Sequence, residues 1–130
     1  MDSQEEKKAW REVKYGEKFS NAFRGMYVAF RVTRHAFVHM AAALLVVILG
    51  FYFNVSSFEW IALIFSIGFV LVSEAFNTAI EIDIDLTSPE YHPYAKDTKD
   101  VAAAAVLLSA FVSVIVGLII FLPYIIAKFF

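Results

Sequence analysis

The side chains best suited to chemistry by type and spacing are those of Glu74, Asn77, Glu81 and Asp85, here called the acid stripe. Steps of three and four residues place them on one face of an α-helix, over roughly three turns. The stripe begins inside an apolar run, where an acidic side chain is costly and rarely retained without a function. Its carboxylates can accept a proton or bind a divalent cation. A packed polar seam between helices is the structural alternative, and Asp83 points to the opposite face.

The composition of the chain indicates a membrane protein. Its 130 residues allow a single domain over residues 1–130. Hydrophobic residues make up 60% of the chain and the mean hydropathy is +0.66, which is too apolar for a soluble domain of this size. The chain has no cysteine, which excludes disulfides, thiolate metal sites and a cysteine nucleophile. It has no Walker-type glycine-rich loop and no nucleic-acid-binding motif, so nucleic acid is not an expected partner.

Three helices with membrane spans are predicted, over residues 36–53, 57–86 and 94–127. The first contains no charged residue. The second begins at a capping box formed by Ser56 and Glu59. Its length of about 45 Å exceeds the hydrocarbon thickness of about 30 Å. The second half of this helix, which carries the acid stripe, must therefore emerge into water.

Residues 1–35 are predicted to form a charged N-terminal segment with one amphipathic helix, from about Trp10 to Thr33. Its apolar side chains recur at spacings of three and four, and lysines and arginines lie between them. This pattern is typical of a helix that lies on the surface of an anionic leaflet. Packing of its apolar face on other helices of the same protein is the alternative, and the two arrangements are compatible.

A second candidate metal site comes from His35 and His39. The two histidines are four residues apart, so one helix face can present both rings to a metal ion. A histidine at the headgroup boundary, where the first span begins, is the commoner explanation. The sequence leaves both explanations open.

The distribution of positive charge indicates how the chain is oriented. Eight of its eleven lysines and arginines precede residue 36, two lie between the second and third spans, and one follows the third span. The link between the first two spans has none. The positive-inside rule then places the N-terminus and the acid stripe in the cytoplasm and the C-terminus outside.

Five motifs together resemble the prokaryotic diacylglycerol kinase family. They are Asn77-Thr-Ala-Ile-Glu81, Asp85-Leu86, Glu90-Tyr-His92, Lys99-Asp100 and Ala104-Ala-Val-Leu107. The resemblance covers about residues 14–110 and is most similar to the undecaprenol kinase branch. It implies an all-α integral membrane protein of a prokaryotic inner membrane, a homotrimer with three transmembrane helices and an N-terminal surface helix per protomer. It also implies transfer of the γ-phosphoryl group of ATP, with Mg²⁺, to undecaprenol or diacylglycerol, which both present a primary hydroxyl.

The resemblance also implies roles for individual residues. Glu74 matches the base that takes the proton from the lipid hydroxyl, Asn77 would orient the base or the phosphate, and Glu81 matches a metal ligand. Ala103 falls where the family contacts its lipid, as Glu74 does. Nucleotide contacts correspond to Lys14, Glu81, Glu90, Tyr91, His92, Lys99 and Asp100. Phosphoryl transfer agrees with this set, because it needs mainly positioning, a metal and charge neutralisation.

The chain departs from the family pattern at the end of the surface helix. The pattern reads Glu, x, Asn, x, Arg, x, His, whereas this chain has Thr33, His35, Phe37 and His39, so only the last residue matches. The acid replaced by Thr33 is a second metal ligand in the family, and a hydroxyl binds a divalent cation more weakly. Phe37 also removes a basic contact to the lipid phosphate. A weakened kinase homologue is therefore one alternative.

A non-enzymatic oligomeric membrane transporter or scaffold is the other alternative. Such a protein could use the same acid stripe. It offers no reason for Lys99 and Asp100 to stand opposite that stripe in the next helix.

Overall fold

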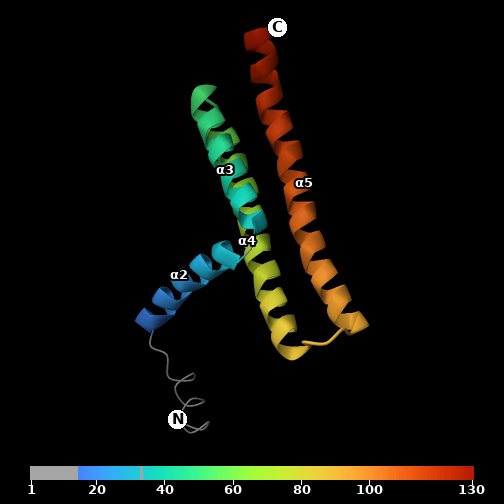
Figure 1. The fold of residues 1–130 in the computed structure, drawn as a ribbon. Coiled ribbons are helices and arrows are strands. Elements are labelled where there is room, and N and C mark those ends of the chain that lie inside the picture. Colours follow the sequence, from blue (N-terminus) through green and yellow to red (C-terminus); the bar gives the residue numbers. More distant parts are fainter. Residues whose placement is uncertain (1–14, 33) are drawn as a thin grey trace.

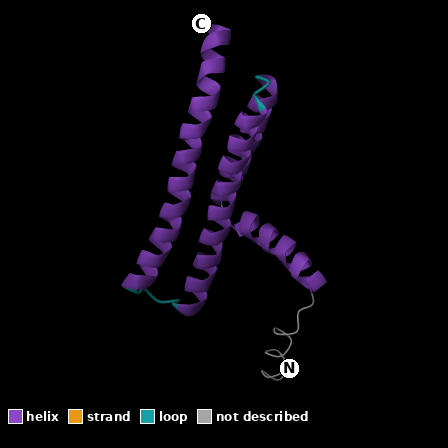
Figure 2. Ribbon diagram, turned by 180° about the vertical axis from the view of Figure 1, so that it is seen from behind, coloured by secondary structure: helices purple, strands orange, loops and turns teal. Residues whose placement is uncertain are grey.

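The computed structural model describes residues 15–32 and 34–130, which form helices and no strand. The helices are α2 (Tyr15–Val32), α3 (Arg34–Tyr52), α4 (Ser57–Thr87) and α5 (Pro93–Phe129). The all-α prediction is therefore confirmed. Figure 1 shows α3 beside the first half of α4, α5 along α4, and α2 leaving the bundle at an angle. The α3–α4 turn and the C-terminus lie at one end, and the α4–α5 turn lies at the other (Figure 2).

Three of the helices are long and apolar enough to cross a membrane, as predicted. The segments are His35–Tyr52, Ser57–Thr87 and Pro93–Phe129, with mean hydropathies of 2.0, 1.8 and 2.9. Large apolar side chains such as Phe65 and Phe111 point outward and are exposed. Apolar surface on this scale needs lipid or other protein to cover it. The fold is that of a membrane protein.

The start of α4 follows directly from its sequence. Ser56 Oγ accepts a hydrogen bond from the Glu59 backbone N–H, and Glu59 Oε2 accepts one from the Ser56 backbone N–H at 2.7 Å. The predicted capping box is therefore confirmed. The hydroxyl of Tyr124 donates to the same Glu59 oxygen at 2.8 Å, which ties the end of α5 to the start of α4.

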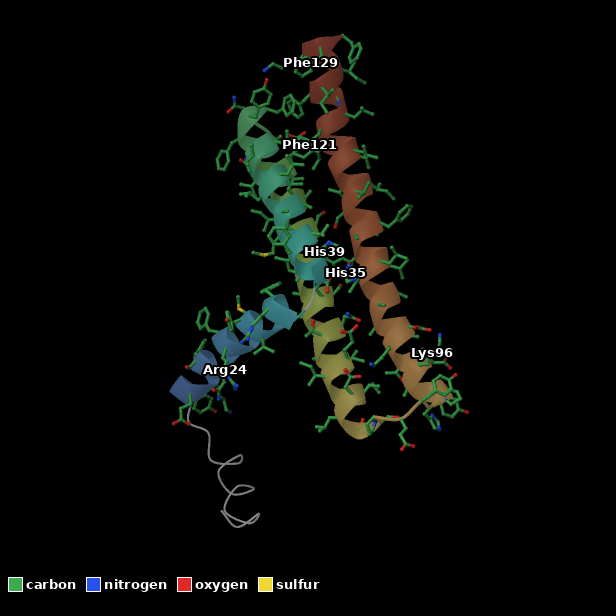
Figure 3. The ribbon with its side chains drawn as sticks, viewed as in Figure 1. Arg24, His35, His39, Lys96, Phe121 and Phe129 are labelled. Atoms are coloured by element: carbon green, nitrogen blue, oxygen red, sulfur yellow. The ribbon has the colours of Figure 1, made fainter. Side chains whose placement is uncertain are left out.

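The core of this end of the bundle is small. Val55, Leu63, Ile120 and Phe121 are buried together, and Phe121 is labelled near this end in Figure 3. Next to this core, α3 approaches the ring of Trp60 at Gly50. A Cβ added at Gly50 would lie 2.6 Å from the ring, so only glycine fits without a shift.

Gly50→Ala is expected to lower the free energy of unfolding by about 1–3 kcal/mol, the usual cost of overpacking. The matched control is Gly68→Ala, because a Cβ at Gly68 meets nothing within 4 Å. There alanine should be neutral or should stabilise α4 by up to about 1 kcal/mol. Thermal unfolding of both variants in detergent measures the difference, and equal midpoints would contradict the close packing at Gly50.

Candidate functional site

The acid stripe runs from a buried to an exposed end along the second half of α4. Glu74 and Asn77 are buried, with 2% and 8% exposure, Glu81 is half-buried, and Asp85 is exposed. The buried end lies near the start of α3, and the exposed end lies at the α4–α5 turn. The stripe therefore connects the interior of the helix bundle to the polar turn.

Glu74 is buried because α2 and α3 both pack on this part of the bundle. Ala29 of α2 and Ala36 of α3 are buried on either side of the bend between these helices, and both helices contact α4. Small side chains at such positions allow helices to approach closely. From α3, His39 Nε2 lies 3.1 Å from Glu74 Oε1. Figure 3 shows His39 on the first turns of α3, where that helix meets α4.

Two buried oxygen atoms beside Glu74 have no hydrogen-bond partner within the part of the chain that the structure describes. They are Asn77 Oδ1 and Thr78 Oγ1. The amide nitrogen of Asn77 donates to Glu81 Oε1 at 3.4 Å, so only its oxygen is left over. A buried unpaired polar group costs about 1–3 kcal/mol, which makes such a group a natural contact for a ligand or water.

The oxygen atoms of Glu81 and Asn77 suit a magnesium ion. Mg²⁺ prefers hard oxygen ligands, and a carboxylate and an amide carbonyl are both of this kind. Asn77 Oδ1 is free to bind, since no described residue donates to it. Across residues 15–32 and 34–130, no three His, Asp or Glu side chains gather tightly enough to hold a metal by themselves.

A polar pocket of about 260 Å³ lies at the α4–α5 turn. Lys99 Nζ pairs with Asp85 Oδ1 across the two helices, and Lys96 pairs with Asp100 within α5. His92 caps α5, because its Nδ1 accepts a hydrogen bond from the Tyr94 backbone N–H at 3.2 Å. The predicted nucleotide residues that line this pocket are Glu90, Tyr91, His92, Lys99 and Asp100. Two lysines beside several acceptor groups can hold a polyphosphate and its ribose or base.

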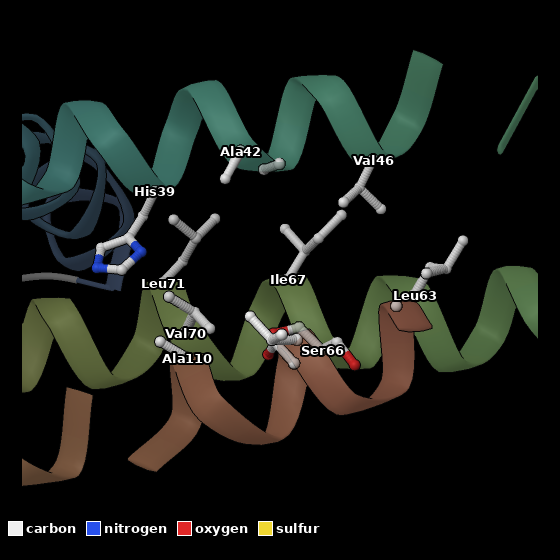
Figure 4. Close-up of a pocket in the computed structure, with 13 residues that line it drawn as sticks. His39, Ala42, Val46, Leu63, Ser66, Ile67, Val70, Leu71 and Ala110 are labelled. Carbon is white, nitrogen blue, oxygen red and sulfur yellow. The ribbon is translucent and has the colours of Figure 1, made fainter. Parts of the chain in front are cut away.

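An apolar cavity of about 320 Å³ lies between α3, α4 and α5 (Figure 4). Val46, Leu63 and Val70 are among the side chains that line it, and His39 lies at one end. On α4, this cavity precedes Glu74 and the polar pocket follows it. Along α4, Glu74 therefore lies between the apolar cavity, whose lining ends at Leu71, and the polar pocket, whose lining begins at Ile84.

The remaining predicted residues are dispersed. Ala103 is exposed on α5 beside the buried Ala102. Lys14 and Thr33 lie outside the described residues. The sequence did not single out Thr78, which lies inside the Asn77–Glu81 motif. His39 was predicted as a metal ligand with His35 or a headgroup-boundary residue, and it matches the family pattern, but its pairing with Glu74 was not predicted.

Comparison with known proteins gives a consistent result. Residues 20–121 match the family described as prokaryotic diacylglycerol kinase. The undecaprenol kinase of Bacillus subtilis (strain 168) is 42% identical over 110 residues, which cover 85% of this chain and 89% of that protein. The diacylglycerol kinase of Synechocystis sp. is 35% identical over 106 residues, 81% of this chain and 61% of that protein. The diacylglycerol kinase of Escherichia coli (strain K12) is 36% identical over 74 residues, 57% of this chain and 61% of that protein.

Proposed function

This chain belongs to the prokaryotic diacylglycerol kinase family, and we propose that it uses ATP and Mg²⁺ to phosphorylate the hydroxyl of a membrane lipid alcohol at the cytoplasmic membrane face. Membership of the family makes the chain a lipid kinase. The observation that carries the mechanism is the position of Glu74, buried at the inner end of the acid stripe between the apolar cavity and the polar pocket.

In this mechanism Glu74 is the general base. It accepts the proton of the lipid hydroxyl while the lipid oxygen forms a bond to the γ-phosphorus and the bond to the ADP oxygen breaks. The lipid chain occupies the apolar cavity, which ends at His39 beside Glu74. Burial of the site excludes water, which would otherwise compete with the lipid for the phosphoryl group.

The other residues of the site bind and orient. The polar pocket holds the nucleotide, with Lys96 and Lys99 beside its phosphates. Glu81 and Asn77 Oδ1 would hold Mg²⁺, which supplies charge neutralisation at the phosphates when bound. From Glu74 to Asp85 is about 16 Å along α4, so the nucleotide enters at the turn and its terminal phosphate points toward Glu74.

Undecaprenol is the proposed acceptor, and diacylglycerol is the second candidate. The undecaprenol kinase of Bacillus subtilis is 42% identical and aligns over 89% of its own length, more than either diacylglycerol kinase above. The protein is proposed to work as a homotrimer in the inner membrane of a prokaryote, with its N-terminus inside. The outward-facing apolar side chains and the concentration of positive charge before residue 36 support this arrangement.

The test is an assay of the purified protein in lipid vesicles that contain undecaprenol or diacylglycerol, with γ-labelled ATP and Mg²⁺. The expected product is labelled undecaprenyl phosphate, formed faster than labelled phosphatidic acid. Absence of labelled lipid from both kinds of vesicle, with the protein still folded, would favour the transporter or scaffold alternative.

Thr78→Val is expected to lower kcat about tenfold. This is the effect of losing one hydrogen bond to the substrate, which contributes about 1–1.5 kcal/mol. Valine has the same shape and removes a hydroxyl that is buried without a partner among the described residues. The thermal midpoint should therefore stay unchanged or rise. Thr78→Ser retains the hydroxyl and is the control. If Thr78→Val has the same kcat as wild type, the hydroxyl makes no contact with substrate.

Thr33→Glu is expected to lower the Mg²⁺ concentration needed for half-maximal turnover. Thr33 stands where the family has an acidic metal ligand, and divalent cations prefer a carboxylate to a hydroxyl. Titration of Mg²⁺ at fixed ATP measures the change. An unchanged or higher Mg²⁺ requirement in a correctly assembled variant would mean that position 33 does not face the metal.

A further inference from the structure

Among the described residues, one ion pair joins α3 to α4, and it involves the proposed base. His39 Nε2 lies 3.1 Å from Glu74 Oε1, and the side chain of Glu74 is only 3% exposed. The other two ion pairs, Lys96 with Asp100 and Lys99 with Asp85, lie at the exposed end of α4 and α5. The most buried carboxylate of the acid stripe is therefore held by a residue outside the stripe.

Glu74 needs such a partner in order to act as a base. A base must be oriented toward the proton that it takes, and a buried carboxylate is held in one orientation only by a polar partner. A buried charge is tolerated when an ionisable or hydrogen-bonding group faces it. The imidazole ring of His39 is the polar group that faces Glu74 Oε1, and the two form an ion pair when the ring is protonated.

We propose that His39 is a positioning residue for Glu74: its ring faces one carboxylate oxygen and leaves the second oxygen to take the proton of the lipid hydroxyl. This inference rests on the proposed function. His39 acts through Glu74 and does not itself exchange a proton with the substrate. Its ring also forms the end of the apolar cavity (Figure 4), so a lipid chain in that cavity reaches Glu74 past the ring.

The partial exposure of His39 supports a role beyond packing. Its side chain is 21% exposed whereas that of Glu74 is 3% exposed, so the ring borders the cavity while the carboxylate lies behind it. A residue that served only to fill space at this position would be better apolar, like Ala42 and Val46 on the same face of α3. A polar ring that faces a buried acid is the arrangement expected of a group that orients that acid.

The experiment is a double-variant cycle in vesicles, with His39→Leu, Glu74→Gln and the two combined. His39→Leu should lower kcat about 10- to 100-fold and leave the KM for ATP within about twofold, because only the base is disturbed. In the Glu74→Gln background His39→Leu should have no further effect, because the group that it positions is gone. Asp83→Asn, on the exposed opposite face of α4, is the control background. In that background His39→Leu should lower kcat as much as it does in the wild type.

His39→Gln tests the same proposal if His39→Leu does not fold. The amide nitrogen of glutamine can replace the ring Nε2, so His39→Gln should retain more of kcat than His39→Leu. If His39→Leu does not fold, the comparison is with His39→Asn, whose shorter side chain cannot place its amide at the same point. Equal losses would overturn the positioning role. Losses from His39→Leu and Glu74→Gln that multiply in the combined variant would also overturn it.

A measurement without turnover separates this inference from the proposed function. The ¹⁵N shifts of the His39 ring in the wild-type protein should change in Glu74→Gln, since the contact to a charged oxygen is lost. A wild-type protein with no lipid kinase activity would overturn the proposed function. An active wild type whose ring shifts are the same in Glu74→Gln would overturn the positioning role alone.

Discussion

Glu74→Gln is expected to lower kcat by about 10²–10⁴-fold, the usual cost of losing a general base. The amide has the shape of the carboxylate but cannot accept a proton from the lipid hydroxyl. Glutamine retains a side-chain oxygen that can face His39 Nε2, so the thermal midpoint should change little. Initial rates with saturating ATP and lipid, together with thermal unfolding, measure both effects.

The matched control for Glu74→Gln is Asp83→Asn. Asp83 is on the same helix, and its substitution by asparagine is likewise a change from carboxylate to amide. Asp83 is, however, exposed and outside the acid stripe. It should keep near wild-type turnover. Turnover close to wild type in Glu74→Gln would remove Glu74 from the role of base, and a similar loss in Asp83→Asn would point to a general effect of charge on α4.

Glu81→Gln is expected to raise the Mg²⁺ concentration for half-maximal turnover about tenfold or more, since interactions with a charged group contribute about 1.5–3 kcal/mol. Glutamine keeps an oxygen that can accept the hydrogen bond from the Asn77 amide, seen here at 3.4 Å, so the local structure should survive. The loss then reports the missing charge. Mg²⁺ titrations of wild type and variant measure it.

Rescue by excess Mg²⁺ distinguishes metal binding from other roles of Glu81. A weakened metal ligand is partly compensated at high Mg²⁺, by mass action. A variant with reduced kcat and an unchanged Mg²⁺ requirement would mean that Glu81 acts on the nucleotide or on Asn77, and does not hold the metal.

The helices and the acid stripe can be predicted from the sequence because both depend on local rules. The capping box of Ser56 and Glu59 fixes the start of α4, and steps of three and four residues define one face of that helix. Because α4 is longer than the membrane is thick, its length also predicts which end of the acid stripe is exposed to water. The gradient from buried Glu74 to exposed Asp85 agrees with that expectation.

The contacts between helices could not be predicted in the same way. The pairing of His39 with Glu74 depends on how far α3 extends along α4, and no local pattern sets that register. The missing partner of Thr78 Oγ1 is also a property of packing, because a threonine in a helix usually bonds to its own backbone. The need for glycine at position 50 could not be predicted either, because it arises from the ring of Trp60, which packs against Gly50 only in the folded structure.

The most direct test of the account is the transfer of label from γ-labelled ATP to undecaprenol by wild-type and Glu74→Gln protein at equal amounts in vesicles. Wild-type protein should form labelled undecaprenyl phosphate in a reaction that needs Mg²⁺, and Glu74→Gln should form almost none while it remains folded. Equal labelling by the two proteins, or no labelled lipid from the wild type, would contradict the claim that this protein phosphorylates a membrane lipid with Glu74 of the acid stripe as the base.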